Sequence, residues 1–213
     1  MEHAHTDHHD HATHEDEQHD HAGHDMGGIN RMAWSATLHC LTGCAVGEIL
    51  GLMIGTALGL GNVWTIALAV GLAFLFGYSF STLPLVRTGL GIGAALSIVF
   101  AADTLSILTM EVVDNLVMAV IPGAMDAGLV NPVFWIGMTI ALAVAAVAAY
   151  PVNRYLLQRG KGHALTHEHH GSDPVTTGWR RLVPAPATST LVAVILAFML
   201  GGLVVSVADA LGA

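Results

Sequence analysis

Three residue types that can bind a metal ion or a proton occur together in one apolar stretch. The stretch contains His39, Cys40, Cys44 and Glu48. A helix would place Cys40, Cys44 and Glu48 on one side, because they recur every four residues. Thiolate and imidazole ligands suit zinc and copper, whereas carboxylates suit harder cations. Cysteine also serves as a small buried packing residue, but a carboxyl in hydrocarbon marks a functional site by default.

A second apolar stretch carries three acids. Asp103, Met110 and Asp114 fall within a narrow arc of a helix, and Glu111 lies beside that arc. Three ionised carboxyls on one helix would repel one another in a low dielectric, and the apolar segments contain a single basic residue, Arg87. The acids must therefore be protonated, hydrated, paired or bound to a cation. Met110 is a candidate ligand only because it shares their face, and its thioether would favour copper.

Small residues accompany the first group. Glycines recur every four residues along the same stretch: Gly43, Gly47, Gly51, Gly55 and Gly59. Small residues at this spacing let two helices approach closely in lipid. The glycines therefore predict that this side of the segment, with the neighbouring thiols and carboxyl, faces protein and not lipid.

The composition indicates an integral membrane protein. The chain has 213 residues, of which 54% are hydrophobic and only 11% are charged, against about 25% charged residues in soluble domains. Seven Lys and Arg against sixteen Asp and Glu cannot form the basic surface of a nucleic-acid binder. Two cysteines do not make a disulfide scaffold. We expect an all-α, polytopic helical bundle with the lipid bilayer as its main partner.

The apolar runs set the number of spans. Four runs approach or exceed the roughly 20 residues needed to cross a bilayer: 34–60, 63–84, 132–153 and 188–208. The region 88–128 is apolar but interrupted by acids. Basic residues favour cytoplasmic loops, and all of them can be cytoplasmic only if 88–128 crosses an odd number of times. We therefore predict five spans with a cytoplasmic N-terminus in the cell membrane; six spans are the main alternative.

The polar segments divide the chain further. Residues 1–30 contain nine of the fourteen histidines and eight of the sixteen acids, without Lys or Arg, so we expect a disordered tail. The expected membrane core covers 31–165, a polar cytoplasmic linker covers 166–187, and 188–213 is an additional span. His-rich tracts bind transition metals, so the tail could collect or sense such ions.

Four strings in the core resemble one known family. They are HCLTGCAVGE (His39–Glu48), AADTLSILTMEVVDN (Ala101–Asn115), PGAMDAGL (Pro122–Leu129) and YPVNRYLLQRGKGHA (Tyr150–Ala164). They resemble an uncharacterised prokaryotic membrane family that is known only as a domain of unknown function. The resemblance covers about residues 32–165 and implies a small integral-membrane domain without an assigned activity. The span at 188–208 lies beyond it.

The favoured hypothesis is a permease or homeostasis protein for zinc or copper. The groups at His39, Cys40, Cys44 and Glu48 would form one half of a metal site. The groups at Asp103, Met110, Glu111 and Asp114 would form the other half. Because five spans are few for a transporter, we expect a homo-oligomer.

Three alternatives remain open. The carboxyls could relay protons in a carrier or channel for another solute. A structural or assembly subunit would use the polar groups only for packing. A thiol-based redox enzyme is disfavoured because side chains four residues apart on a helix are poorly aimed for a disulfide, and we do not expect an enzyme.

Overall fold

The computed structural model describes residues 17–159, 178–183 and 187–212, and these residues form helices and short connections. The α-helices are α1 (Glu17–Ala57), α2 (Asn62–Arg87), α3 (Ile92–Val120), α4 (Pro132–Gln158) and α6 (Thr188–Ala210). A short 3-10 helix, η1, covers Gly178–Leu182. No β-strand occurs in the described ranges, which confirms the expected all-α class.

Five of these helices are long and apolar enough to cross a membrane: Gly27–Ala57, Asn62–Arg87, Ile92–Val120, Pro132–Gln158 and Ser189–Ala210. The ambiguous region 88–128 therefore supplies one span, as predicted. The 29 residues of α3 correspond to about 43 Å of helix at 1.5 Å per residue. This length exceeds the roughly 30 Å hydrocarbon core, so α3 must tilt or protrude if it spans a bilayer.

The first helix begins earlier than the sequence boundary suggested. It starts at Glu17, so residues 17–30, which were expected to be disordered, continue the first span as helix. Adding residues to a helix that is already nucleated is much easier than starting one, which accounts for this extension. Residues 1–16 of the predicted tail and most of the predicted linker lie outside the described residues.

Turns at the helix ends follow local sequence signals. Gly59 has a φ of +63°, a left-handed conformation that glycine adopts readily, and it lies in the turn after α1. The fifth glycine of the expected stripe therefore belongs to a turn and not to the helix. At the start of α4, Asn131 accepts a hydrogen bond from the backbone N–H of Val133 at 2.9 Å, and Pro132 occupies the first helical position, where its missing N–H costs nothing.

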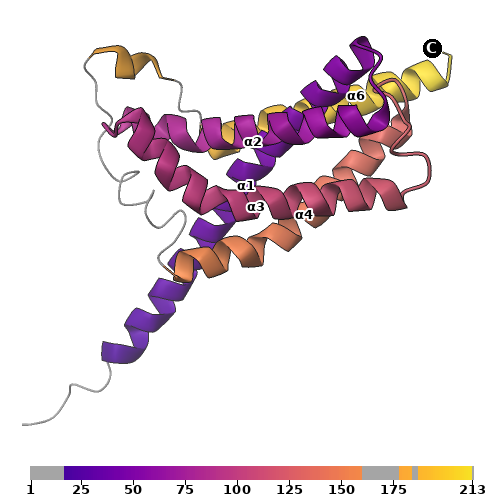
Figure 1. Ribbon diagram of the computed structural model, residues 1–213. Coiled ribbons are helices and arrows are strands. Elements are labelled where there is room, and N and C mark those ends of the chain that lie inside the picture. The colour runs from indigo at the N-terminus through magenta and orange to yellow at the C-terminus, as the bar shows by residue number, and fades with distance from the viewer. Residues whose placement is uncertain (1–16, 160–177, 184–186, 213) are drawn as a thin grey trace, which may run out of the picture.

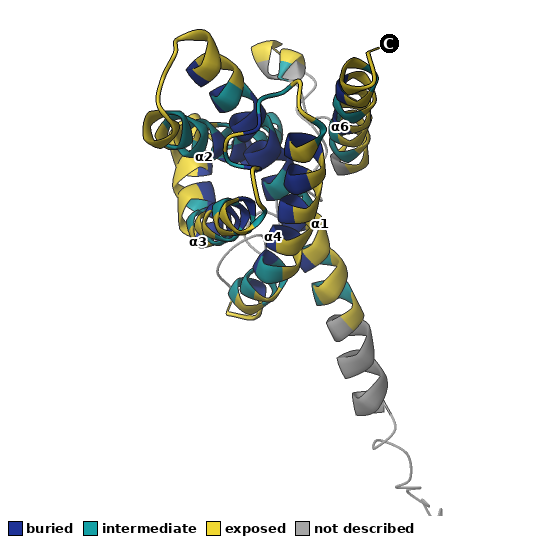
Figure 2. Ribbon diagram, turned by 90° about the vertical axis from the view of Figure 1, so that its right-hand side faces the viewer, coloured by how far each residue is buried: buried dark blue, intermediate teal, exposed yellow. Residues whose placement is uncertain are grey.

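Helix α1 is the centre of the bundle. It contacts α2, α3, α4 and α6 and crosses the other helices obliquely (Figure 1). Buried residues concentrate on α1 and on the sides of its neighbours that face it, whereas the outer sides of α2, α3 and α6 are exposed (Figure 2). Many of those exposed side chains are large and apolar, such as Leu75, Phe100 and Val204, as expected for helices that face lipid.

The glycine stripe brings α1 and α2 into close contact. Four glycines face α2: Gly43, Gly47, Gly51 and Gly55. A Cβ atom added to Gly47 would lie 2.2 Å from the backbone nitrogen of Ala73, so no larger residue fits without moving one helix. This arrangement confirms the predicted protein-facing side of the first span.

Candidate functional site between helices α1 and α3

The two groups of candidate residues meet where α1 packs against α3. Seven of the eight are exposed by at most 8%: Cys40, Cys44, Glu48, Asp103, Met110, Glu111 and Asp114. The two helices run in the same direction because one helix, α2, separates them in the chain. Residues further along α1 therefore meet residues further along α3.

Two levels of this contact pair a thiol with an acid. At the first level the Cys40 thiol interacts with Asp103 and Ser106. At the second level the Cys44 thiol interacts with Glu111. Both cysteines are buried and free, so each contributes a thiol and not half of a disulfide.

The third level pairs two acids. The carboxyl of Glu48 interacts with that of Asp114 and, more weakly, with that of Glu111. The three levels form a continuous arrangement, which we call the acid–thiol ladder: Cys40 with Asp103, Cys44 with Glu111, and Glu48 with Asp114. The face predicted for α1 and the arc predicted for α3 thus face one another.

Three acids of the ladder are buried without adequate partners. Within the described part of the chain, neither carboxyl oxygen of Glu48 or Glu111 forms a hydrogen bond, nor does Oδ1 of Asp114. A buried polar group without a partner costs roughly 1–3 kcal/mol, and an isolated charge costs far more. These carboxyls therefore need a proton, water or a cation from outside the described side chains.

Some other buried polar side chains in the bundle are satisfied by neighbouring groups. Asn153 donates a hydrogen bond from Nδ2 to the hydroxyl oxygen of Thr37 at 2.9 Å, and Thr37 in turn donates to the carbonyl of Ala33 at 2.8 Å. The hydroxyl of Thr42 donates to the carbonyl of Leu38 at 2.8 Å. The hydroxyls of Ser81, Thr82 and Ser106 also lack partners in the described residues, but a buried carboxyl is costlier to leave without a partner than a hydroxyl, because it can carry a full charge.

The eighth candidate, His39, lies against α2. Its Nε2 donates a hydrogen bond to the backbone carbonyl oxygen of Phe80 at 2.8 Å. Proline at position 84 has no N–H to donate to the carbonyl four residues earlier, and that carbonyl belongs to Phe80. His39 therefore supplies the donor that the helix lacks, and its Nε2 is occupied by this bond.

The candidates do not form a closed coordination shell. Among the described residues, no three His, Cys, Asp or Glu side chains are grouped so that they could hold a metal ion. The ladder offers its groups in pairs along the helices. A cation bound at one level would have to take its remaining ligands from water or from neighbouring oxygens.

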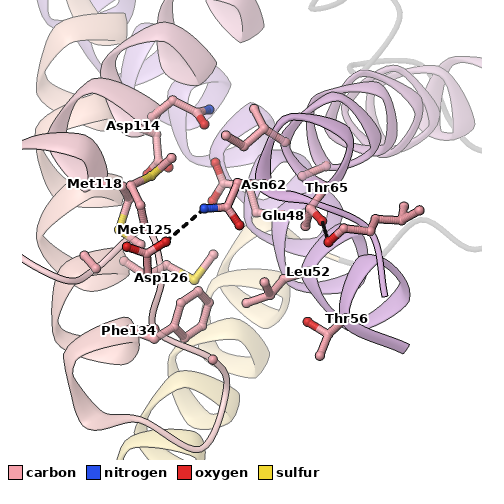
Figure 3. A pocket seen from close by; sticks show the side chains of 18 residues that line it. Glu48, Leu52, Thr56, Asn62, Thr65, Asp114, Met118, Met125, Asp126 and Phe134 are labelled. Atoms are coloured by element: carbon pink, nitrogen blue, oxygen red, sulfur yellow. Dashed lines mark hydrogen bonds between the residues drawn. The ribbon is translucent and has the colours of Figure 1, made fainter. Parts of the chain in front are cut away.

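A cavity of about 310 Å³ opens beside the acid pair of the ladder. Glu48 and Asp114 both line it, together with side chains from the start of α2 and from the loop after α3 (Figure 3). Asn62 and Asp126 stand at its exposed rim, where Nδ2 of Asn62 donates a hydrogen bond to Oδ1 of Asp126 at 2.9 Å. The sequence reasoning missed these two residues. The available signal was a polar residue at the start of α2 and another in the loop after α3, at the same end of the bundle.

Comparisons with known proteins address the family alone. No curated protein and no solved structure matches the chain. A family model described as a domain of unknown function matches residues 30–162, close to the range of 32–165 expected from the four strings. The match covers more than half of the chain, contains every residue of the ladder and leaves α6 outside. The chain therefore belongs to the family of domains of unknown function described as DUF4396.

Proposed function

We propose that the protein is a cell-membrane permease that moves a transition-metal cation, zinc or copper, along the acid–thiol ladder. One observation carries the proposal: Glu48 and Glu111 are buried without hydrogen-bond partners in the described residues. Ionisable residues inside membrane helices characteristically mark ion pathways or proton relays. A cation would compensate these carboxyls where no basic side chain does.

Pairs of ligands along the ladder suit the movement of a cation better than its tight and lasting binding. Conduction requires binding that is strong enough to admit an ion and weak enough to release it. Two protein ligands at each level, completed by water, would bind more weakly than a closed shell of four. An ion could therefore pass from the pair Glu48 and Asp114 to Cys44 and Glu111, and then to Cys40 and Asp103.

The ligand types favour a borderline or soft cation. The deeper two levels contain a thiol, and thiolate suits zinc and copper(I) better than magnesium or calcium. Because metal ligands must be deprotonated, each ion that binds a thiol or a protonated carboxyl displaces protons. Metal movement should therefore be accompanied by proton release at the loaded level.

The proposal extends to the parts of the chain around the ladder. The His-rich residues 1–30 would collect or sense the ion on the cytoplasmic side, where we place the N-terminus. The exposed apolar faces of α2 and α6 would contact lipid or further copies of the chain. A homo-oligomer fits the small number of spans.

Flux through proteoliposomes tests the proposal. The Glu111→Gln variant should lower zinc or copper flux at least tenfold, because an amide keeps the shape but cannot carry the charge. The Asp209→Asn variant is the matched control, since Asp209 is an exposed acid at the end of α6, and it should keep the unmodified rate. Full flux through Glu111→Gln would refute the assigned path.

A proton-coupled carrier for another solute is the second candidate. The observation in its favour is that no three potential ligands are grouped in the described residues, since a proton relay needs none. It predicts that Cys44→Ser leaves transport intact whereas Glu111→Gln does not. A metal permease instead loses most of its flux in both variants. If both variants transport normally, the ladder serves packing, and a structural subunit is the better account.

A further inference from the structure

The cavity beside the acid pair has walls from several parts of the chain. Glu48 comes from α1, Asp114 from α3, and Asp126 from the loop that follows α3. Thr65 of α2 closes another side, and Figure 3 shows these side chains around one space. The cavity lies at the end of the bundle where α1 passes into α2, opposite the end that carries Arg31 and Arg87.

Two buried carboxyls reach this cavity. Glu48 is 8% exposed and Asp114 is 5% exposed. Both carboxyl oxygens of Glu48 and Oδ1 of Asp114 lack hydrogen-bond partners in the described residues. Unpartnered acids at the bottom of an open cavity disfavour an anion and favour a cation. No described side chain provides that cation.

The size of the cavity limits the form of the cation. Its volume of about 310 Å³ corresponds to roughly ten water molecules at about 30 Å³ each. An ion with about six waters fits this space. Because the described acids, histidines and cysteines do not group in threes, the ion would keep some of this water.

We propose that this cavity is a vestibule that holds a partly hydrated divalent cation between Glu48 and Asp114, before the ion meets the thiol levels. This inference rests on the proposed function and names the place where the ion exchanges bulk water for protein ligands. The vestibule offers mainly oxygen ligands, whereas the next level adds the Cys44 thiol. The ion would thus lose water in steps along its path.

Chemical modification of Glu48 tests the vestibule without measuring transport. A water-soluble carbodiimide, which modifies accessible protonated carboxyls, is added to the full chain in liposomes, and mass spectrometry measures modification at each acid. Without added metal, Glu48 should be modified. Zinc at saturating concentration should reduce this modification at least fivefold, whereas choline at equal ionic strength should not. Exposed Asp209 is the internal control and should react equally in all conditions.

Variants at the second acid make the test specific. In Asp114→Asn the zinc concentration for half-maximal protection of Glu48 should rise at least fivefold, because one of the two carboxylates is lost. Three results would contradict the vestibule proposal. The first is that the carbodiimide does not modify Glu48 in the metal-free protein, and the second is that zinc does not change the modification. The third is that choline protects Glu48 as well as zinc does, or better.

The same experiment distinguishes a failure of the vestibule proposal from a failure of the permease proposal. Glu111 does not line the cavity, so Glu111→Gln should retain zinc protection of Glu48 although it loses flux. Protection without flux in the unmodified protein would leave the vestibule intact and refute the permease. Flux that depends on Glu111, with no protection of Glu48, would refute the vestibule alone.

Discussion

His39 on α1 donates a hydrogen bond from Nε2 to the backbone carbonyl of Phe80 on α2, at 2.8 Å. That carbonyl is the one deprived of a helical donor by Pro84. A hydrogen bond of this kind typically contributes about 0.5–1.5 kcal/mol, and a buried acceptor left unsatisfied costs about 1–3 kcal/mol. The histidine therefore serves the contact between α1 and α2.

The first prediction couples this histidine to the proline. His39→Leu should lower the unfolding free energy by about 1–3 kcal/mol, because the carbonyl of Phe80 loses its donor. In a Pro84→Ala background the helix regains its N–H, and the same change at His39 should cost less. A double-mutant cycle by thermal unfolding in detergent measures the coupling. Equal costs in both backgrounds would contradict this account of His39.

The second prediction concerns the hydrogen bond between Asn62 and Asp126 at the rim of the cavity. Asn62→Ala and Asp126→Ala should each speed carbodiimide modification of Glu48, because each frees the turn before α2 from the loop after α3. Stability should change by no more than about 1 kcal/mol, since the bond is exposed. The double variant should react no faster than either single one. Additive increases would mean that the two residues act separately.

The third prediction concerns the glycine contact between α1 and α2. Gly47→Ala places a Cβ 2.2 Å from the backbone of Ala73, so the helices must separate, and overpacking of this kind costs about 1–3 kcal/mol. Gly71→Ala is the matched control, because a Cβ there meets nothing within 4 Å and alanine favours helix. Thermal unfolding in detergent compares them. Equal stability of the two variants would argue against the close contact.

The fourth prediction concerns topology. If all five candidate spans cross the membrane, the two chain ends lie on opposite sides of it, whereas six spans would place them on one side. With the arginine-bearing helix ends in the cytoplasm, an N-terminal epitope tag should be protected from protease added outside intact cells. A C-terminal tag should be cleaved under the same conditions. Identical behaviour of both tags would contradict five spans.

Much of the fold follows from local sequence properties. Apolar runs of sufficient length predicted four of the spans, because crossing a membrane is mainly a matter of length and hydrophobicity, and the distribution of basic residues predicted the fifth, within 88–128. The start of α1 at Glu17 could not be predicted from the local sequence, because a helix extends into polar residues once the adjoining segment is helical.

Part of the candidate site could be predicted from the sequence, because helix geometry determines which residues share a face. Spacing of four residues placed Cys40, Cys44 and Glu48 on one face, and that face indeed meets α3. His39 was grouped with them because it adjoins Cys40 in sequence, but neighbouring residues on a helix do not share a face. The hydrogen bond between Asn62, at the start of α2, and Asp126, in the loop after α3, joins positions that lie 64 residues apart. A single sequence contains no signal for which helix end meets which loop.

The glycine contact also restricts how the protein can change shape. With backbone against backbone from Gly43 to Gly51, α1 and α2 have almost no compressible side chains between them, and we expect them to move together as one rigid body. Any alternation between two states therefore has to occur by sliding or rocking of α3 and α4 against that body. The contact that moves is then the one between α1 and α3, which contains the acid–thiol ladder. A conformational change would therefore alter the surroundings of those acids and thiols directly.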